Sequence, residues 1–273
     1  MDKTLTVAVE GGLCNRLHVA FSARLLAERR GDVDVRIKWD GRHKECAARF
    51  DQLFRSADMP WFSITESRFA DFPARRSNLW LPATLRRLAG CDLQLNRIDP
   101  RPKGLIDGAL DAHSNVYLST CYPIIPLPDG YLAQCLRPIP ELQARIDAIT
   151  SRYRKRHTTG LHIRRTDNAA SISQSPDEAF LRAIDERIAA DADALFFVAT
   201  DDEAFKQRLM EKYPGRIITQ QTENRRDTAG GIQCAVVDVW CLAMTDGIVG
   251  SAHSSFSEVA AEIGGIKLEV AGI

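Results

Sequence analysis

Residues 160–202 read GLHIRRTDNAASISQSPDEAFLRAIDERIAADADALFFVATDD and alternate between strand and helix patterns. Two short apolar runs, Gly160–Arg164 and Leu195–Ala199, predict strands, and the apolar spacing over Asp177–Ala190 predicts a helix between them. The alternation continues to the end of the chain, with helices expected at 202–212, 231–244 and 254–263 and strands at 216–219, 247–249 and 267–270. Strands that alternate with helices predict a parallel sheet covered on both faces.

The N-terminal residues show the same pattern around a pair of glycines. Leu5–Val9 predicts a strand, and Gly11-Gly12 follows it at once. A helical pattern begins at Asn15 and stops at Gly31. Val33–Trp39 then alternates apolar and polar residues, as in a strand with one buried face. The N-terminal half is therefore also expected to be of the α/β class.

The middle of the chain is less regular. Residues 41–115 predict short helices and long loops, and their arginine pairs at 75–76 and 86–87 are interpreted as solvated helix faces. A prolyl stretch at 122–131 and a basic run at 152–157 flank one more predicted helix. Since 273 residues suit two domains, we place them at 1–150 and 151–273.

Composition excludes several classes of protein. Apolar residues make up 45% of the chain, and 36 basic residues balance 36 acidic ones. The zero net charge predicts no general attraction to nucleic acid. Apolar runs such as Ala194–Thr200 are too short for a transmembrane segment, and no secretory signal is evident, so we expect a cytoplasmic protein. The seven cysteines form no CxxC pair, which predicts buried thiols rather than a zinc site.

Candidate site residues follow the predicted strands, where open α/β sheets bind ligands. Gly11 and Gly12 allow close backbone approach to an anion, with Asn15 beyond them. The alternative is a tight turn in which Asn15 caps the helix.

His162 and Arg164 share one face of the next predicted strand end, and Arg165 points the other way. An arginine there suits bidentate binding of a diphosphate, and Asp167 could orient one of the guanidinium groups. The alternative is a surface ion pair of Arg165 with Asp167 and a core His162.

Asp201 and Asp202 close the following strand. A metal, acid–base chemistry or simple helix capping would each explain them.

Two further groups lie nearer the C-terminus. Asp238 lies off the apolar stripe of its predicted helix, which permits either exposure or a ligand contact. Ser254 and Ser255 precede a helix where hydroxyl and N–H groups could meet a phosphate. The spacing of Ser255 and Glu258 also fits a capping box.

Together these segments resemble the fucosyltransferase superfamily, which includes α-1,6-, nodulation, α-1,2- and protein O-fucosyltransferases. Residues 160–167, GLHIRRTD, resemble its HxRRxD signature, residues 198–202 its second motif, and residues 237–255 its third. Residues 11–17, GGLCNRL, resemble its GGxxNQ turn, with Arg16 in place of glutamine. The resemblance is most extensive over residues 160–263.

The resemblance implies a GT-B fold, two Rossmann-like lobes facing a cleft, and an inverting transfer from GDP-fucose to a carbohydrate acceptor that needs neither a metal nor another cofactor. Arg164 would hold the diphosphate near His162, and Asp238 would accept hydrogen bonds from the guanine. Ser254 and its neighbour Ser255 would contact phosphate. Arg165 and Asp167 would support the site, with Asp201 and Asp202 nearby. Asn15 would contact the reacting sugar.

One departure concerns the general base. The α-1,6 enzymes carry a lysine and then a glutamate after the aspartate, whereas this chain has Asn168 and no carboxylate through Ser175. The base is then Asp167, His18 or a residue of the N-terminal region that the resemblance does not cover, or the step has little base assistance. The alternatives are a catalytically weak sugar-nucleotide-binding protein, use of another GDP-sugar, or a different α/β enzyme. Acceptor, linkage and oligomeric state do not follow from the sequence.

Overall fold

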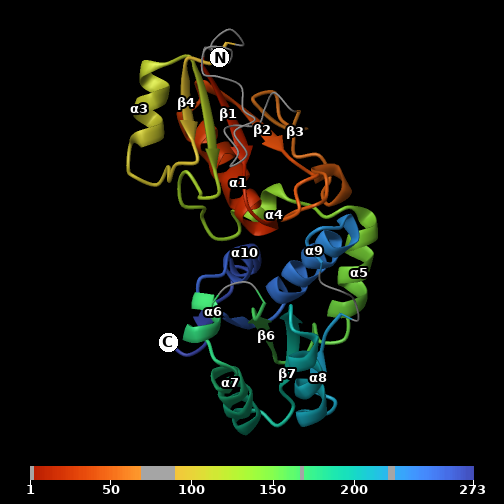
Figure 1. The fold of residues 1–273 in the computed structure, drawn as a ribbon. Coiled ribbons are helices and arrows are strands. Elements are labelled where there is room, and N and C mark those ends of the chain that lie inside the picture. Colours follow the sequence, from red (N-terminus) through yellow and green to blue (C-terminus); the bar gives the residue numbers. More distant parts are fainter. Residues whose placement is uncertain (1–2, 69–89, 167–168, 221–224) are drawn as a thin grey trace. The chain divides into compact units, whose positions relative to one another are not determined.

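The computed structural model describes residues 3–68, 90–166, 169–220 and 225–273 (Figure 1). The chain divides into two compact units of similar size. The first unit comprises Met1–Leu127, Cys135–Arg137 and Arg226–Ile232, and the second comprises Pro128–Gln134, Pro138–Arg225 and Gln233–Ile273. The predicted arginine pairs at 75–76 and 86–87 lie outside the described residues.

The first unit is built on a five-stranded sheet in which all neighbouring strands are parallel. The strand order is β3-β2-β1-β5-β4. The strands are β1 (Lys3–Val9), β2 (Val33–Trp39), β3 (Phe62–Glu66), β4 (Leu93–Asn96) and β5 (Asn115–Thr120). The helical segments are α1 (Leu13–Arg30), a 3-10 turn at Phe50–Gln52, α3 (Leu105–Ala112) and α4 (Tyr131–Cys135), the last shared with the second unit.

The second unit repeats this design. Its parallel sheet has the order β10-β9-β6-β7-β8. The strands are β6 (Thr158–Ile163), β7 (Leu195–Thr200), β8 (Ile217–Ile218), β9 (Gly247–Gly250) and β10 (Leu268–Val270). The helices are α5 (Pro140–Thr150), α6 (Ala169–Gln174), α7 (Asp177–Ala190), α8 (Glu203–Lys212), α9 (Ala229–Ala243) and α10 (Ser255–Gly264).

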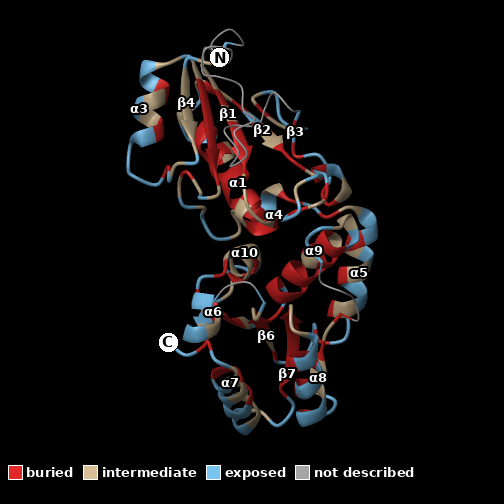
Figure 2. Cartoon of the chain, in the orientation of Figure 1, coloured by how far each residue is buried: buried red, intermediate tan, exposed pale blue. Residues whose placement is uncertain are grey.

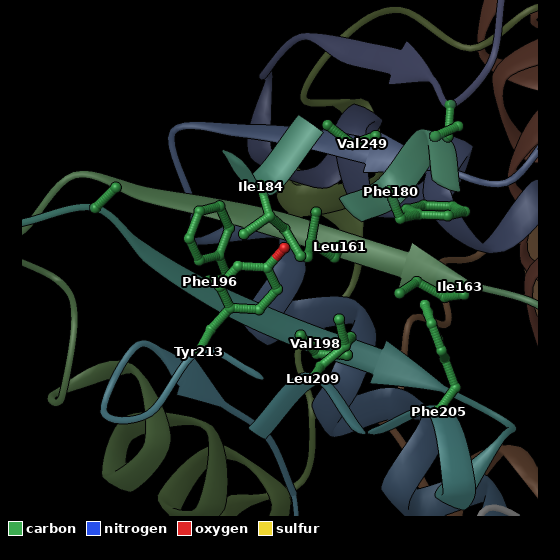
Figure 3. Packing of buried hydrophobic residues seen from close by; sticks show 13 residues of the cluster. Leu161, Ile163, Phe180, Ile184, Phe196, Val198, Phe205, Leu209, Tyr213 and Val249 are labelled. Carbon is green, nitrogen blue, oxygen red and sulfur yellow. The ribbon is translucent and has the colours of Figure 1, made fainter. Parts of the chain in front are cut away.

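The core of the second unit explains why its central strands read as apolar runs. All six residues of β7 are buried, as is most of α9 (Figure 2). Leu161 and Val198 pack with Phe180 of α7 and Phe205 of α8 (Figure 3). Strands buried on both faces lose the alternation seen in half-exposed sheets. The predicted α/β class with parallel sheets is confirmed in both units.

The division between the units differs from the predicted one at residue 150. Helix α5 belongs to the second unit, where Tyr153 just beyond it donates a hydrogen bond to the Cys241 carbonyl oxygen at 2.6 Å. Residues 226–232 return to the first unit. Sequence patterns mark helices and strands, but which sheet a connecting helix packs against depends on long-range contacts.

All seven cysteines are free, and Cys14, Cys46, Cys234 and Cys241 are buried. Within the described ranges, no helix has both the length and the apolarity that crossing a membrane requires.

Candidate functional site

The second sheet reverses its winding direction between β6 and β9. From β6 the chain proceeds to β7 and β8 on one side, and then returns to β9 and β10 on the other. Open α/β sheets bind ligands at such a switch point, outside the carboxyl ends of the strands. The residues that follow β6 and β9 therefore define the candidate site of this unit.

Arg164 directly follows β6, and the neighbouring strand fixes its backbone. Its N–H donates to Ser251 Oγ at 3.0 Å, and the Ser251 N–H donates to the His162 carbonyl oxygen at 3.0 Å. The Arg164 side chain is half-buried. A guanidinium fixed at this point has the charge and the planar donor geometry that suit a diphosphate.

Ser254 brings a buried hydroxyl to the start of α10. It is the N-cap residue of this helix, but its side chain makes no capping hydrogen bond. Its Oγ is buried and has no hydrogen-bond partner in the described part of the chain. Buried hydroxyls in native proteins are nearly always paired, and a helix N-terminus presents free N–H groups to anions. These two observations together indicate an anion site.

The first residues of α10 complete this edge of the sheet. Ser255 is the first helical residue rather than the N-cap, so the predicted capping box of Ser255 and Glu258 is wrong. In a capping box the serine is the N-cap residue, whereas here the S-x-x-E pattern begins one residue later, at the first residue of the helix. The spacing alone does not distinguish these two positions. His162 is buried, and its ring stacks on Phe256 with a centroid distance of 4.6 Å.

Arg165 is turned into the core of the second unit. Its Nε donates to Asp177 Oδ1 at 2.7 Å, and its guanidinium lies over the rings of Phe180 and Phe205. These contacts fix the Arg165 side chain in the second unit, while its Nη2 is buried and has no hydrogen-bond partner among the described residues. The ion-pair partner of Arg165 within the described part of the chain is Asp177. Asp167 lies outside the described residues.

The carboxylates of the two aspartates after β7 accept hydrogen bonds from backbone N–H groups. Asp201 accepts hydrogen bonds from the Arg165 N–H at 2.7 Å and from the Thr166 hydroxyl at 2.7 Å. Asp202 is the N-cap of α8 and accepts from the Phe205 N–H at 2.9 Å. The capping alternative is therefore confirmed for Asp202, and Asp201 shapes the loop that follows β6.

Asp238 lies in a buried polar cluster, because α9 is buried on almost every face. It is 4% exposed and accepts a short hydrogen bond from Gln220 Nε2. Gln220 Oε1 accepts from Arg145 at 2.9 Å, and the Gln220 carbonyl oxygen accepts from Lys206 at 3.4 Å. Burial raises the pKa of Asp238 to about 7, although the Gln220 hydrogen bond and the charges of Lys206 and Arg145 oppose this shift.

The glycine turn of the first unit joins β1 to α1. Gly11 has a φ of +83°, and a Cβ there would lie 2.9 Å from Asn15 Nδ2. The N-cap of α1 is Gly12, so the alternative in which Asn15 caps the helix is wrong. Arg16 is 1% exposed and donates to the Gly11 carbonyl oxygen at 2.8 Å and the Asp40 carbonyl oxygen at 2.7 Å. The arginine thus ties the ends of β1 and β2 together.

A pocket of about 680 Å³ opens at the carboxyl edge of the first sheet. It lies at that sheet's own switch point, where β1 and β5 are neighbours while the chain runs from β1 to β2 and β3 on the other side. The polar and aromatic side chains that line it include Glu10, Asn15, Lys38, Asp40, Arg97 and Tyr122. His18 is buried in α1 and does not line it.

One wall of this pocket is the loop after β2. Trp39 Nε1 donates to the Ala48 carbonyl oxygen at 2.9 Å. A Cβ on Gly41 would lie 2.7 Å from the Arg49 nitrogen, so the two ends of the segment 41–49 are in contact. His43, Lys44 and Glu45 reach the pocket from this closed loop.

Sequence reasoning did not single out Glu10, Arg97 or Tyr122. Glu10 had a usable signal, because it directly follows the predicted strand Leu5–Val9. Arg97 follows β4, which was not predicted, and Tyr122 lies in the prolyl stretch interpreted as irregular. The described residues contain no group of three or more His, Cys, Asp or Glu side chains that could hold a metal ion.

Comparisons with known proteins identify the fold. No family model and no curated protein sequence matches the chain. The NodZ α-1,6-fucosyltransferase soaked with GDP-fucose is 17% identical and superposes with a TM-score of 0.64 over 96% of this chain and 93% of that one. POFUT1 in complex with GDP is 12% identical, with a TM-score of 0.59 over 100% and 99% of the two chains.

A third solved structure extends the comparison to plants. A mutant of FUT1 from Arabidopsis thaliana in complex with GDP is 13% identical, with a TM-score of 0.62 over 99% of this chain and 70% of that one. The resemblance drawn from the sequence is thus confirmed at the level of the fold. The chain has the GT-B type α/β fold, with two parallel five-stranded sheets, of the fucosyltransferases NodZ, FUT1 and POFUT1.

Proposed function

We propose that the protein is a glycosyltransferase that moves L-fucose from GDP-fucose to a hydroxyl group of a glycan or glycolipid, with inversion and without a metal. The observation that carries this proposal is the unpaired, buried hydroxyl of Ser254 at the N-terminus of α10, at the same switch point as Arg164. The names of the matched structures, which contain GDP or GDP-fucose, supply the ligand that this anion site would take.

In this proposal the diphosphate is the leaving group, and the protein stabilises the charge that develops on it. Arg164 would fork onto phosphate oxygens, while Ser254 and the free N–H groups of α10 would donate to others. Donors that are already in place when charge develops lower the barrier without reorganisation. An arginine in this role replaces the electrostatic effect of a divalent metal.

The nucleoside is proposed to lie near the stacked rings of His162 and Phe256, and its guanine to be recognised by Asp238. An ionised carboxylate can accept hydrogen bonds from both guanine N1–H and the exocyclic amine. Adenine lacks this pair of donors, so the recognition would select GDP over ADP. Asn15 of the first unit is proposed to contact the reacting sugar.

Nucleotide binding tests the donor site. Isothermal titration calorimetry with GDP, ADP, UDP and NAD should detect tight binding of GDP only. Ser254→Ala should weaken GDP binding roughly tenfold to a hundredfold, as expected for a hydrogen bond to a charged group. Ser151→Ala is the matched control, because the Ser151 hydroxyl is exposed and bonded to the Ala148 carbonyl oxygen of α5.

Transfer is tested separately with GDP-fucose and a glycan array. Fucose incorporated into any acceptor supports the transferase. GDP binding with neither transfer nor release of GDP from GDP-fucose would instead favour the sugar-nucleotide-binding protein. Transfer from another GDP-sugar, but not from GDP-fucose, would show that the donor sugar is not fucose.

A further inference from the structure

We propose that Glu10 is the general base of the transfer and that Arg97 positions it. The proposal rests on the proposed function and names the group that takes the acceptor's proton. In the step, the acceptor oxygen bonds to the anomeric carbon of fucose, and the bond from that carbon to the β-phosphate oxygen breaks. The electron pair of the broken bond leaves with GDP, and the hydroxyl proton passes to the Glu10 carboxylate.

Glu10 has the placement that a base requires. It directly follows β1, the central strand of the first sheet, and lines the pocket at the switch point. Its N–H donates to the Thr120 carbonyl oxygen at 3.0 Å, which extends the pairing of β1 with β5 by one residue. Groups carried on central strands are held more accurately than groups on loops. Gly11 next to it adopts the positive φ of +83° with which the chain turns from β1 into α1.

Arg97 holds the carboxylate from the end of β4. Its Nε lies 3.4 Å from Glu10 Oε1, and both side chains are about one-third exposed, at 36% and 28%. Arg97 has a φ of +52°, which is uncommon for a residue with a side chain. Its N–H donates to Ser119 Oγ at 2.8 Å, which helps to hold this backbone conformation. Strained residues of this kind cluster at functional sites.

The other candidate bases lining this pocket are less suited. Asp40 is 6% exposed, and its Oδ1 accepts from the Arg42 N–H at 3.2 Å. His43 Nδ1 accepts from the Glu45 N–H at 3.4 Å, so both residues belong to the internal bonding of the loop. Glu45 is exposed on that loop. Among the described acids of the pocket, Glu10 combines access with a rigid backbone.

The pocket also suits a sugar ring. Tyr122 lines it and is 43% exposed, with the Arg101 guanidinium 4.6 Å from its ring centroid. An exposed aromatic face can cover the C–H face of a sugar, while Asn15 and Lys38 can bond to its hydroxyls.

The test compares Glu10→Gln with Glu28→Gln, the same change on an exposed carboxylate of α1 that does not line the pocket. GDP release from GDP-fucose is measured with water as the acceptor, and GDP binding is measured by calorimetry. Glu10→Gln should bind GDP within about twofold of wild type but release GDP about a hundredfold more slowly, as expected for loss of a general base. Glu28→Gln should release GDP at the wild-type rate.

Rescue of Glu10→Gln by azide distinguishes a general base from a residue with only a structural role. Azide attacks as an anion and has no proton to lose, so it does not need the base. Adding sodium azide should restore GDP release by Glu10→Gln to within about tenfold of the wild-type rate, with fucosyl azide detected by mass spectrometry. Arg97→Gln should lower the water rate less than Glu10→Gln does.

Three outcomes would overturn the assignment: Glu10→Gln that keeps at least a third of the wild-type water rate, Glu28→Gln that loses as much activity, or no rescue by azide. A wild-type protein that does not bind GDP-fucose, or binds it yet releases no GDP, would instead be a failure of the proposed function.

Discussion

Two adjacent arginines, Arg164 and Arg165, have different surroundings although they follow the same strand. Arg165 is fixed by Asp177 and by two aromatic rings of the core. Arg164 is half-buried at the switch point beside Ser251. Residue type alone does not distinguish them, but the alternation of side chains along a strand does.

Arg164→Ala should lower kcat by about two orders of magnitude or more. A guanidinium on the diphosphate contributes more in the transition state than in the ground state, and loss of one preorganised donor costs ~2.7–4 kcal/mol. Arg164→Lys should restore little, because a point charge does not reproduce the forked geometry. Single-turnover GDP release measures the effect. A folded Arg164→Ala protein with near-normal kcat would contradict the mechanism.

Arg165→Ala is the matched control on the neighbouring residue. Its loss leaves Asp177 without one of its two ion pairs, the other being with Arg208. We expect the free energy of unfolding to fall by about 2 kcal/mol or more, whereas Arg164→Ala should change the melting temperature little.

Asp238→Asn should become relatively more stable than wild type as the pH rises. The pKa of Asp238 is raised by burial to about 7 in the folded protein, against about 4 in the unfolded chain. Between these values the folded state holds the proton and the unfolded state does not. The contribution of Asp238 to the free energy of unfolding is therefore fully present below about pH 4 and is lost as the pH rises through about 7.

Urea unfolding of wild type and Asp238→Asn at intervals from pH 5 to 8 measures this difference. The asparagine keeps an oxygen that can accept from Gln220 Nε2 but does not titrate. A stability difference that stays constant with pH would show that the carboxyl is ionised in the folded protein throughout.

At the scale of elements, the turn from β1 to α1 depends on a residue that departs from the resembled family. Arg16→Met should lower the free energy of unfolding by about 2–4 kcal/mol, because the carbonyl oxygens of Gly11 and Asp40 lose their buried donor. Arg29→Met, an exposed arginine of the same helix, is the control. Chemical denaturation compares them, and equal losses would contradict the assigned role of Arg16.

The elements that the sequence predicted are those with the most buried apolar surface. Each predicted strand and helix of the second half exists, with ends shifted by one or two residues. Strands β3 and β4 were missed because they are the edges of their sheet and bury little: every residue of β4 is only half-buried. Edge strands lack the apolar pattern on which prediction depends.

For the whole molecule, we expect EDTA to leave transfer unchanged. The groups proposed to face the phosphates are Arg164, Ser254 and the N–H groups of α10, all of which act without a metal. The measurement is GDP release from GDP-fucose with EDTA, compared with added Mg²⁺ or Mn²⁺. Complete loss on chelation, restored by either ion, would contradict this account of the leaving group.

Much of the candidate site could be predicted because parallel sheets bring their strand ends to one edge. That rule selected Arg164, Ser254 and Asn15 from the sequence. The rule could not show that Asp201 and Asp202 bond to backbone N–H groups, or that Asp238 is buried. Those facts depend on contacts between distant elements. The rule also passed over Glu10, whose partner Arg97 follows a strand that the sequence did not reveal.

The closed loop 41–49 has a consequence for reshaping the pocket of the first unit. Because Gly41 and Arg49 are in contact, and the Trp39 ring bonds to Ala48, the loop enters and leaves the fold at nearly one point. The entropy of closing a loop grows only with the logarithm of its length, so a few added residues cost a few tenths of a kcal/mol. Residues 43–45, which reach the pocket, could therefore be lengthened or exchanged to reshape it, while both sheets and the proposed donor site keep their sequences.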